Sequence, residues 1–73
     1  MARHRLVVLG ANGDRTVTYD PALEEDVERA VEEFERLLSQ GYSAFQTKPV
    51  EKRIERLETR TEEVMLIPQI AGG

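Results

Sequence analysis

The sequence predicts an α+β domain in which a mixed sheet of four or five strands packs on one main helix. Three observations predict this fold class. Residues 23–38 carry apolar side chains at helical spacing, and β-rich runs flank this stretch on both sides. The first and the last of these runs are apolar on both faces, which is typical of central strands. A chain of 73 residues forms one domain with a single modest core.

The first two runs are predicted to form a β-hairpin. Residues 5–9 (RLVVL) are apolar, and residues 15–19 (RTVTY) alternate between apolar and polar side chains. The intervening residues 10–14 (GANGD) contain the two glycines and the asparagine that a tight reversal needs. We expect this segment to be a turn rather than a phosphate loop, because it lacks the lysine of such loops and precedes a strand.

A helix is predicted to follow the hairpin. Asp20 is the expected N-cap and Pro21 the first helical residue, and three acidic residues complement the positive end of the helix dipole. Gly41 is the expected left-handed residue that ends the helix. The apolar stripe consists of Leu23, Val27, Ala30, Val31, Phe34, Leu37 and Leu38.

The rest of the chain is predicted to complete the sheet. Residues 42–47 form a third strand and residues 64–67 a second central strand. Residues 50–58 are expected to form a short irregular strand, and a helical turn or two is the alternative there. Pro68 ends the regular pairing, so residues 1–68 constitute the domain and residues 69–73 a C-terminal tail.

The two central strands should lie side by side, with the helix across one face of the sheet. A sheet that grips one helix in this way is the β-grasp arrangement, and a ββαβ fragment of another α+β fold is the alternative. Which member of each alternating pair points inward is not fixed, because a slip of one residue exchanges the two faces. The expected core consists of Leu6, Val8, Val17, Val27, Val31, Phe34, Leu38, Phe45, Leu57 and Leu66.

Composition and charge exclude several classes of function. The chain has no cysteine, so disulfides, thiolate nucleophiles and Cys-ligated metal sites are excluded. The net charge of −4 disfavours nucleic acids and anionic membranes as partners. The apolar run Leu6–Leu9 is too short for a signal peptide or a membrane span. We therefore expect a cytoplasmic protein that is monomeric on its own.

No catalytic or metal-binding constellation is predicted. His4 is the only histidine and is expected on the surface of the first strand, without a partner for nucleophilic or metal chemistry. The helix carboxylates belong to a solvated face, where Glu25–Arg29 and Glu32–Arg36 are expected ion pairs. We expect no cofactor and no enzymatic activity.

The chain ends in Gly72-Gly73, which suggests a different role for its terminal carboxylate. Two residues without a Cβ can thread a narrow tunnel and deliver this carboxylate to ATP bound by another protein. Attack on the α-phosphate would give an acyl-adenylate that a thiol or a sulfide could intercept. The alternative is a frayed terminus without function.

The element order together with the ending Ala71-Gly72-Gly73 resembles the ubiquitin-like superfamily. The segment Leu66–Gly73 is similar to the tails of prokaryotic sulfur carriers of the MoaD and ThiS type. Together with this tail, residues 41–45 (GYSAF) resemble small bacterial and phage ubiquitin-like proteins.

This resemblance implies activation of Gly73 by a ubiquitin-activating-type adenylyltransferase and its ATP. A protein modifier would then be joined to target lysines through a conjugating enzyme and removed by a JAMM-type protease. A sulfur carrier would instead receive sulfide from a sulfurtransferase as a C-terminal thiocarboxylate. We favour the modifier, and a non-covalent β-grasp adaptor remains a further alternative. The residues expected to serve activation and partner binding are Gly73, Gly72, Ala71, Ile70, Gln69, Pro68 and Met65.

The face of the sheet opposite the helix is the expected docking surface. Its candidate contacts near the tail are Met65, Ile67 and Ile70. Burial in the core is the alternative for Met65 and is slightly favoured for Ile67. Ile70 follows Pro68 and is the better candidate for a pocket on a partner.

Overall fold

The computed structural model describes residues 3–10, 13–58 and 60–68, which form one helix and a five-stranded sheet. This confirms the predicted α+β class with one main helix. The elements along the chain are β1 (His4–Val8), β2 (Arg15–Tyr19), α1 (Glu24–Ser39), β3 (Ser43–Lys48), β4 (Lys52–Ile54) and β5 (Glu63–Ile67).

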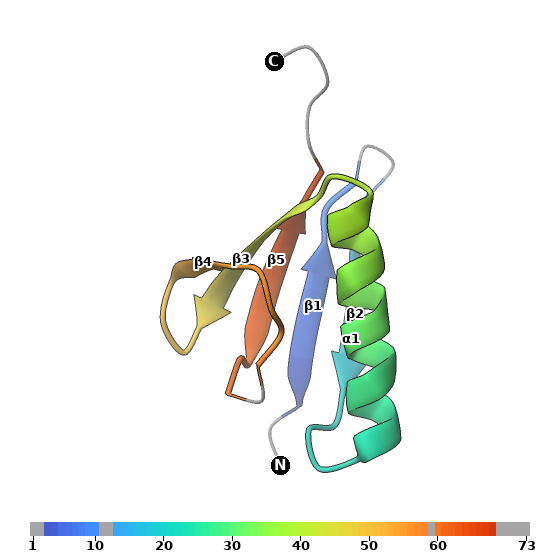
Figure 1. The fold of residues 1–73 in the computed structure, drawn as a ribbon. Helices are drawn as coiled ribbons and strands as arrows, with labels where there is room; N and C mark the ends of the chain where they lie inside the picture. Colours follow the sequence, from blue (N-terminus) through green and yellow to red (C-terminus); the bar gives the residue numbers. More distant parts are fainter. Residues whose placement is uncertain (1–2, 11–12, 59, 69–73) are drawn as a thin grey trace.

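The strands lie in the order β2-β1-β5-β3-β4, with the first and the last strand of the chain adjacent at the centre (Figure 1). β1 and β5 run parallel, with Leu6 opposite Val64 and Val8 opposite Leu66, and the other neighbours are antiparallel. The helix covers one face of the sheet and leaves the other open. The predicted pairing of the two apolar runs is confirmed, and the arrangement is consistent with a β-grasp.

The helix begins three residues later than predicted. Asp20 does not cap it, because its Oδ1 accepts a hydrogen bond from the Ala22 N–H at 2.9 Å and so closes a turn before the helix. Leu23 occupies the N-cap position without a side-chain hydrogen bond, and α1 starts at Glu24. The side chain of Asp26 instead contacts the backbone of Asp20, because its Oδ2 accepts a hydrogen bond from the Asp20 N–H at 3.2 Å.

The end of the helix is as predicted. Gly41 has a φ of 100°, in the left-handed region. Its N–H donates to the carbonyl oxygen of Leu38 at 3.0 Å, and the N–H of Tyr42 donates to that of Leu37 at 3.0 Å. These two bonds form a Schellman motif, which turns the chain directly into β3.

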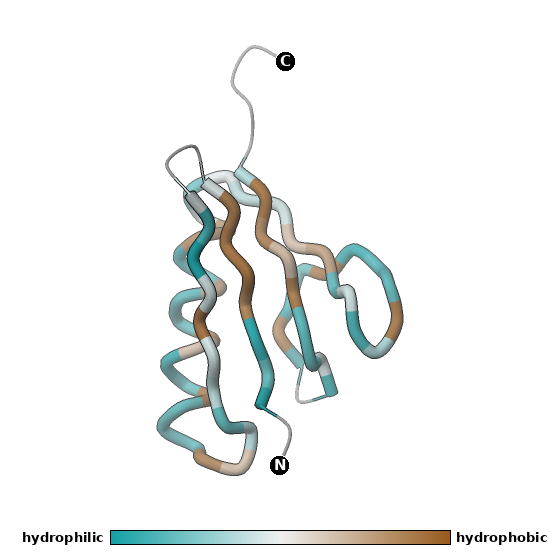
Figure 2. The backbone as a smooth tube through the Cα atoms, turned by 180° about the vertical axis from the view of Figure 1, so that it is seen from behind, coloured by the Kyte–Doolittle hydropathy of each residue, from teal (hydrophilic) through white to brown (hydrophobic). Residues whose placement is uncertain are grey.

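The core lies between α1 and the covered face of the sheet. Leu6, Val8, Phe34 and Leu66 are buried as predicted. The expected residues Val17, Val27, Leu38 and Leu57 are partly buried against this core, and Val31 is half-buried. The other apolar residues buried in the core are Tyr19, Ala30, Leu37, Ala44, Ile54 and Val64. Figure 2 shows the apolar stretches of β1 and β5 side by side.

Phe45 was predicted in the core, and the structure contradicts this. Ala44 lies opposite Leu66 and points to the covered face, so its neighbour Phe45 points to the open face and is 37% exposed. The core receives its large aromatic ring from Phe34 of the helix, which is fully buried, and the small buried side chain of Ala44 from β3.

His4 is buried rather than on the surface, which corrects the prediction. It lies on the covered face of β1, 8% exposed, with its ring edge-on to Tyr19 at a centroid distance of 5.4 Å. Its Nδ1 is buried and has no hydrogen-bond partner among the described residues. The alternation of β1 explains this position, because His4 shares a face with Leu6.

Residues 50–58 contain the short strand predicted there, and a buried polar network holds it in place. The Gln46 Nε2 donates to the carbonyl oxygen of Val50 at 2.8 Å. The Thr61 Oγ1 donates to the Gln46 Oε1 at 2.8 Å, and both side chains are buried. Gln46 therefore joins the hairpin between β3 and β4 to the segment that enters β5.

Candidate functional site

The open face of the sheet carries an apolar surface that we call the open-face patch, formed by Val7, Phe45, Met65 and Ile67. The strand register creates it. Met65 lies opposite Val7 on one side and Phe45 on the other, and Ile67 follows on the same face of β5. Three adjacent strands thus place their apolar side chains on one surface.

The members of the patch are accessible to different degrees. Phe45 and Ile67 are 37% and 36% exposed, while Val7 and Met65 are half-buried. The expectation that placed Ile67 in the core is therefore wrong. A shallow depression of about 500 Å³ adjoins the patch, and Phe45, Met65 and Ile67 line it together with Lys52 and Arg53. Glu51 lines the depression as well, and an apolar floor with charged side chains of both signs at its rim can accept an apolar side chain of a partner.

A polar cluster borders the patch at the start of β5. The Arg5 Nη2 lies 2.7 Å from the Glu63 Oε2, and the Thr47 Oγ1 donates to the Glu63 Oε1 at 2.7 Å. The hydrogen bond from Thr47, followed by the positive charge of Arg5, lowers the pKa of Glu63 below its ordinary value. This carboxylate is a fixed anion at neutral pH rather than a proton donor.

The predicted site residues fall into two groups. Met65 lies on the open face as expected, and Pro68 follows the end of β5 and is half-buried. The others, Gln69, Ile70, Ala71, Gly72 and Gly73, lie outside the described residues.

Two members of the patch were not predicted from the sequence. Val7 was not named, and Phe45 was placed on the wrong face of β3. The signal that could have found them is the pairing of β1 with β5: once Leu6 and Leu66 are assigned to the core, Val7 and Met65 must share the open face.

Charged side chains of the described residues pair in two clusters, one around Glu63 and one around Glu33. In the described ranges, no three His, Asp or Glu side chains come together in a way that could hold a metal ion. The second ionic cluster lies on the helix side, where Glu33 contacts Arg15 at 2.7 Å and Arg36 at 2.5 Å. Arg36 therefore does not pair with Glu32 as predicted. The described part of the chain also forms no ion pair between Glu25 and Arg29.

None of the helical segments described has both the length and the apolar character that a membrane crossing requires. Compared with protein-family models, with curated proteins and with solved structures, the chain gives no significant match.

Proposed function

We propose that this chain is a ubiquitin-like protein modifier of β-grasp fold, activated by ATP-dependent adenylation at Gly73. The observation that carries the proposal is the sheet order β2-β1-β5-β3-β4 with parallel central strands β1 and β5. Because the last strand lies at the centre of the sheet, its C-terminal end is held rigidly by a neighbour on each side. The segment that follows it reads Pro68-Gln69-Ile70-Ala71-Gly72-Gly73.

The proposed chemistry takes place in a partner. The carboxylate of Gly73 attacks the α-phosphorus of ATP bound by an adenylyltransferase, and pyrophosphate leaves. A cysteine thiolate of the partner then attacks the acyl carbon and expels AMP, which gives a thioester. A target lysine finally displaces the thiolate to form an isopeptide. This chain supplies the acyl group and no catalytic side chain.

The open-face patch is the proposed docking surface for the adenylyltransferase. Ile67 is 36% exposed and directly precedes Pro68, so a partner that covers the patch also lies close to the start of the tail. Burying Phe45 and Ile67 in the contact would add apolar area to it. The fixed charges of Arg5 and Glu63 beside the patch would restrict its orientation.

The experiment is a search for the adduct in the source organism. No lysine or arginine follows Arg60, so trypsin would leave residues 61–73 attached to the modified lysine. We expect mass spectrometry of an N-terminally tagged chain to find this branched peptide. A chain lacking Gly73 should give none, whereas the matched Arg29→Gln variant, at an exposed position on α1, should retain it.

The outcome also separates the alternatives. An intact mass in which one oxygen of the terminal carboxylate is replaced by sulfur would identify a sulfur carrier. The proposal would be overturned if the intact mass showed an unmodified terminal carboxylate in every fraction and removal of Gly73 left partner binding unaffected. The remaining alternative would then be a non-covalent adaptor.

A further inference from the structure

The cationic side chains of this acidic protein concentrate at one edge of the sheet. Residues 48–60 hold five of the ten bases and three acids, a net charge of +2, and the rest of the chain therefore carries −6. Elsewhere, bases such as Arg5, Arg15 and Arg36 form ion pairs. Within the described ranges, none of the bases in residues 48–60 has a carboxylate within 4.0 Å.

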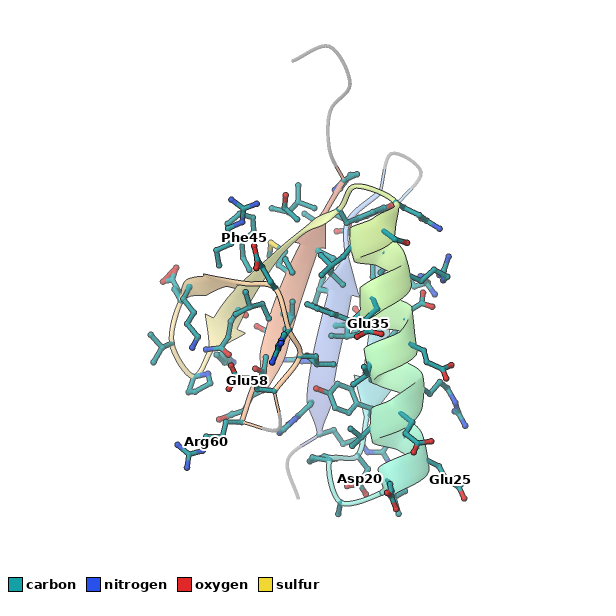
Figure 3. The ribbon with its side chains drawn as sticks, viewed as in Figure 1. Asp20, Glu25, Glu35, Phe45, Glu58 and Arg60 are labelled. Carbon is teal, nitrogen blue, oxygen red and sulfur yellow. The ribbon has the colours of Figure 1, made fainter. Side chains whose placement is uncertain are left out.

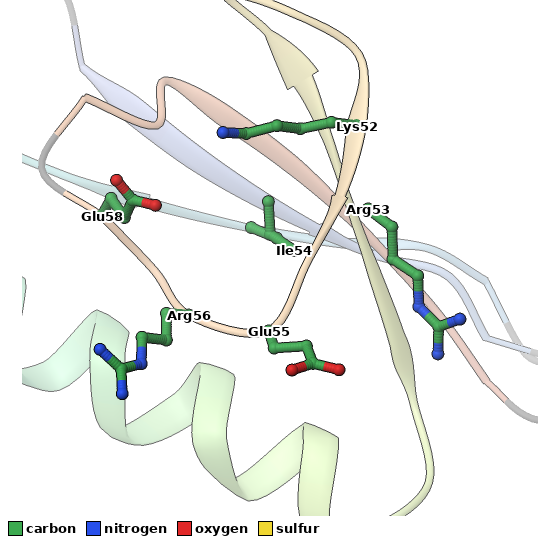
Figure 4. Close-up of a pocket in the computed structure, with 6 residues that line it drawn as sticks. All are labelled: Lys52, Arg53, Ile54, Glu55, Arg56 and Glu58. Carbon is green, nitrogen blue, oxygen red and sulfur yellow. The ribbon is translucent and has the colours of Figure 1, made fainter.

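These bases lie around β4, the edge strand. We call Lys48, Lys52, Arg53 and Arg56 the hairpin surface; all four are exposed. Figure 4 shows Lys52, Arg53 and Arg56 spread around Ile54, which lines a hollow of about 490 Å³ with them. Glu55 and Glu58 also line this hollow and offset part of its charge.

An acidic surface of similar length lies on the helix. Glu24, Glu28, Glu32 and Glu35, which we call the helix stripe, recur at intervals of three or four residues and are all exposed. The stripe is about 16 Å long at a rise of about 1.5 Å per residue. For comparison, the part of the hairpin surface from Lys52 to Arg56 spans at most about 14 Å, because a fully extended chain advances about 3.3–3.6 Å per residue. No member of the stripe has an ion pair in the part of the chain that the structure describes.

Among the described residues, no ion pair joins the two surfaces within one molecule, although Leu57 and Glu58, just beyond the hairpin surface, line a small hollow together with Val27 and Val31 of α1. α1 packs nearest β2, whereas β4 is the opposite edge of the sheet (Figure 1). Figure 3 shows Glu35 on the helix and Glu58 on the segment that follows β4. Each surface also has an exposed apolar neighbour, Val50 (63%) beside the bases and Leu23 (53%) at the start of the stripe.

We infer that the hairpin surface binds the helix stripe of a second copy of this chain, in a weak head-to-tail association. The positive charge of the hairpin surface and the negative charge of the helix stripe are complementary, which favours a second copy as the partner. Because the two contact surfaces differ, the contact is heterologous and can continue from copy to copy. At about 0.1 M salt the Debye length is about 10 Å, so the repulsion between whole molecules is largely screened while pairs in direct contact still attract.

Charged side chains on an edge strand also discourage unwanted β-pairing, and either sign of charge serves that purpose. A charge reversal therefore separates the two roles. Lys52→Glu/Arg53→Glu keeps the edge charged and should abolish association. Adding Glu28→Lys/Glu32→Lys reverses two of the four charges of the helix stripe to match the two reversed on the hairpin surface, restores the net charge of −4, and should restore association.

The test is sedimentation of the full chain at millimolar concentration, with circular dichroism to verify folding of every variant. We expect wild-type association at about 0.1 M salt to weaken roughly tenfold at about 0.5 M. Arg3→Glu/Arg29→Glu lowers the net charge as much as the hairpin reversal does and should still associate. A monomeric wild type, association by the hairpin reversal alone, or failure of the folded four-site variant to associate would each overturn the inference.

Discussion

Phe45 on β3 lies directly opposite Met65 on β5, and both side chains belong to the face of the sheet that the helix leaves uncovered. The immediate neighbours Ala44 and Leu66 form the corresponding pair on the covered face, where both are buried. One of these two adjacent cross-strand pairs thus belongs to the core and the other to the open-face patch, the proposed docking surface. This division makes stability and binding separable by mutation.

Phe45→Ser is expected to change stability little and binding strongly. The side chain is already 37% exposed, so losing its cross-strand contacts should cost about 0.2–1 kcal/mol in the free energy of unfolding. Phe34→Ala, a truncation of a fully buried ring, should cost about 3–5 kcal/mol. Urea unfolding measures both values. If the patch docks the adenylyltransferase, Phe45→Ser should also weaken that binding about tenfold or more.

A loss of several kcal/mol in Phe45→Ser would show that the ring belongs to the core after all. The matched variant for binding is Arg29→Gln on α1, an exposed side chain on the other side of the sheet from the patch. It should leave both stability and binding unchanged.

Thr61→Val is expected to destabilise the fold by about 1–3 kcal/mol. Valine has nearly the same shape as threonine but cannot donate to the Gln46 Oε1, which is then buried without a partner. Thr18→Val, at an exposed position on β2, should change stability by no more than about 0.5 kcal/mol. Denaturant unfolding of the two variants makes the comparison. If the two variants lost equally little stability, water would be the hydrogen-bond donor to the Gln46 Oε1 in solution.

Regular patterns in the sequence predicted most of the fold. The helical stripe located α1, Gly41 located its end, and the two runs apolar on both faces identified the central pair β1 and β5. Each of these signals comes from a repeated or strongly constrained physical requirement, namely a buried face, a positive φ, or burial on two sides.

Choices between neighbouring residues were harder to predict. Asp20 can cap a turn or a helix, and only its hydrogen bond to the Ala22 N–H decides between them. Whether position 44 or 45 faces the helix depends on the register with β5, which no local pattern encodes. The open-face patch depends on the same register, so half of it was missed. His4 lies near the chain terminus and was expected on the surface, whereas its position in β1 buries it.

Gly41→Ala is expected to destabilise the protein by about 1–2 kcal/mol. Gly41 has a φ of 100°, and a Cβ disfavours the left-handed region by about that amount. Gln40→Ala is the matched control, since Gln40 precedes it with a φ of −86° and should tolerate alanine within about 0.5 kcal/mol. Thermal unfolding measures both. An unchanged melting temperature in Gly41→Ala would mean that the turn into β3 adopts another conformation.

Glu33→Gln is expected to lower stability at neutral pH but not in acid. Hydrogen bonds from Arg36 and then Arg15 lower the pKa of Glu33, so the folded state favours the carboxylate more than the unfolded state does. This contribution is present above the ordinary glutamate pKa of about 4.3 and is lost as pH falls through the lower value of the folded state. Both arginines are more than half exposed, which limits it to about 0.2–1 kcal/mol.

Urea unfolding of wild type and Glu33→Gln at neutral pH and at pH about 2–3 tests this expectation. The difference between them should shrink toward zero in acid, because both then carry a neutral group at position 33. Glu35→Gln alters an exposed carboxylate without an ion pair among the described residues and should differ little from wild type at either pH. If the Glu33→Gln deficit persisted in acid, its origin would be packing against β2 rather than charge, and the cluster would contribute no pH dependence to the fold.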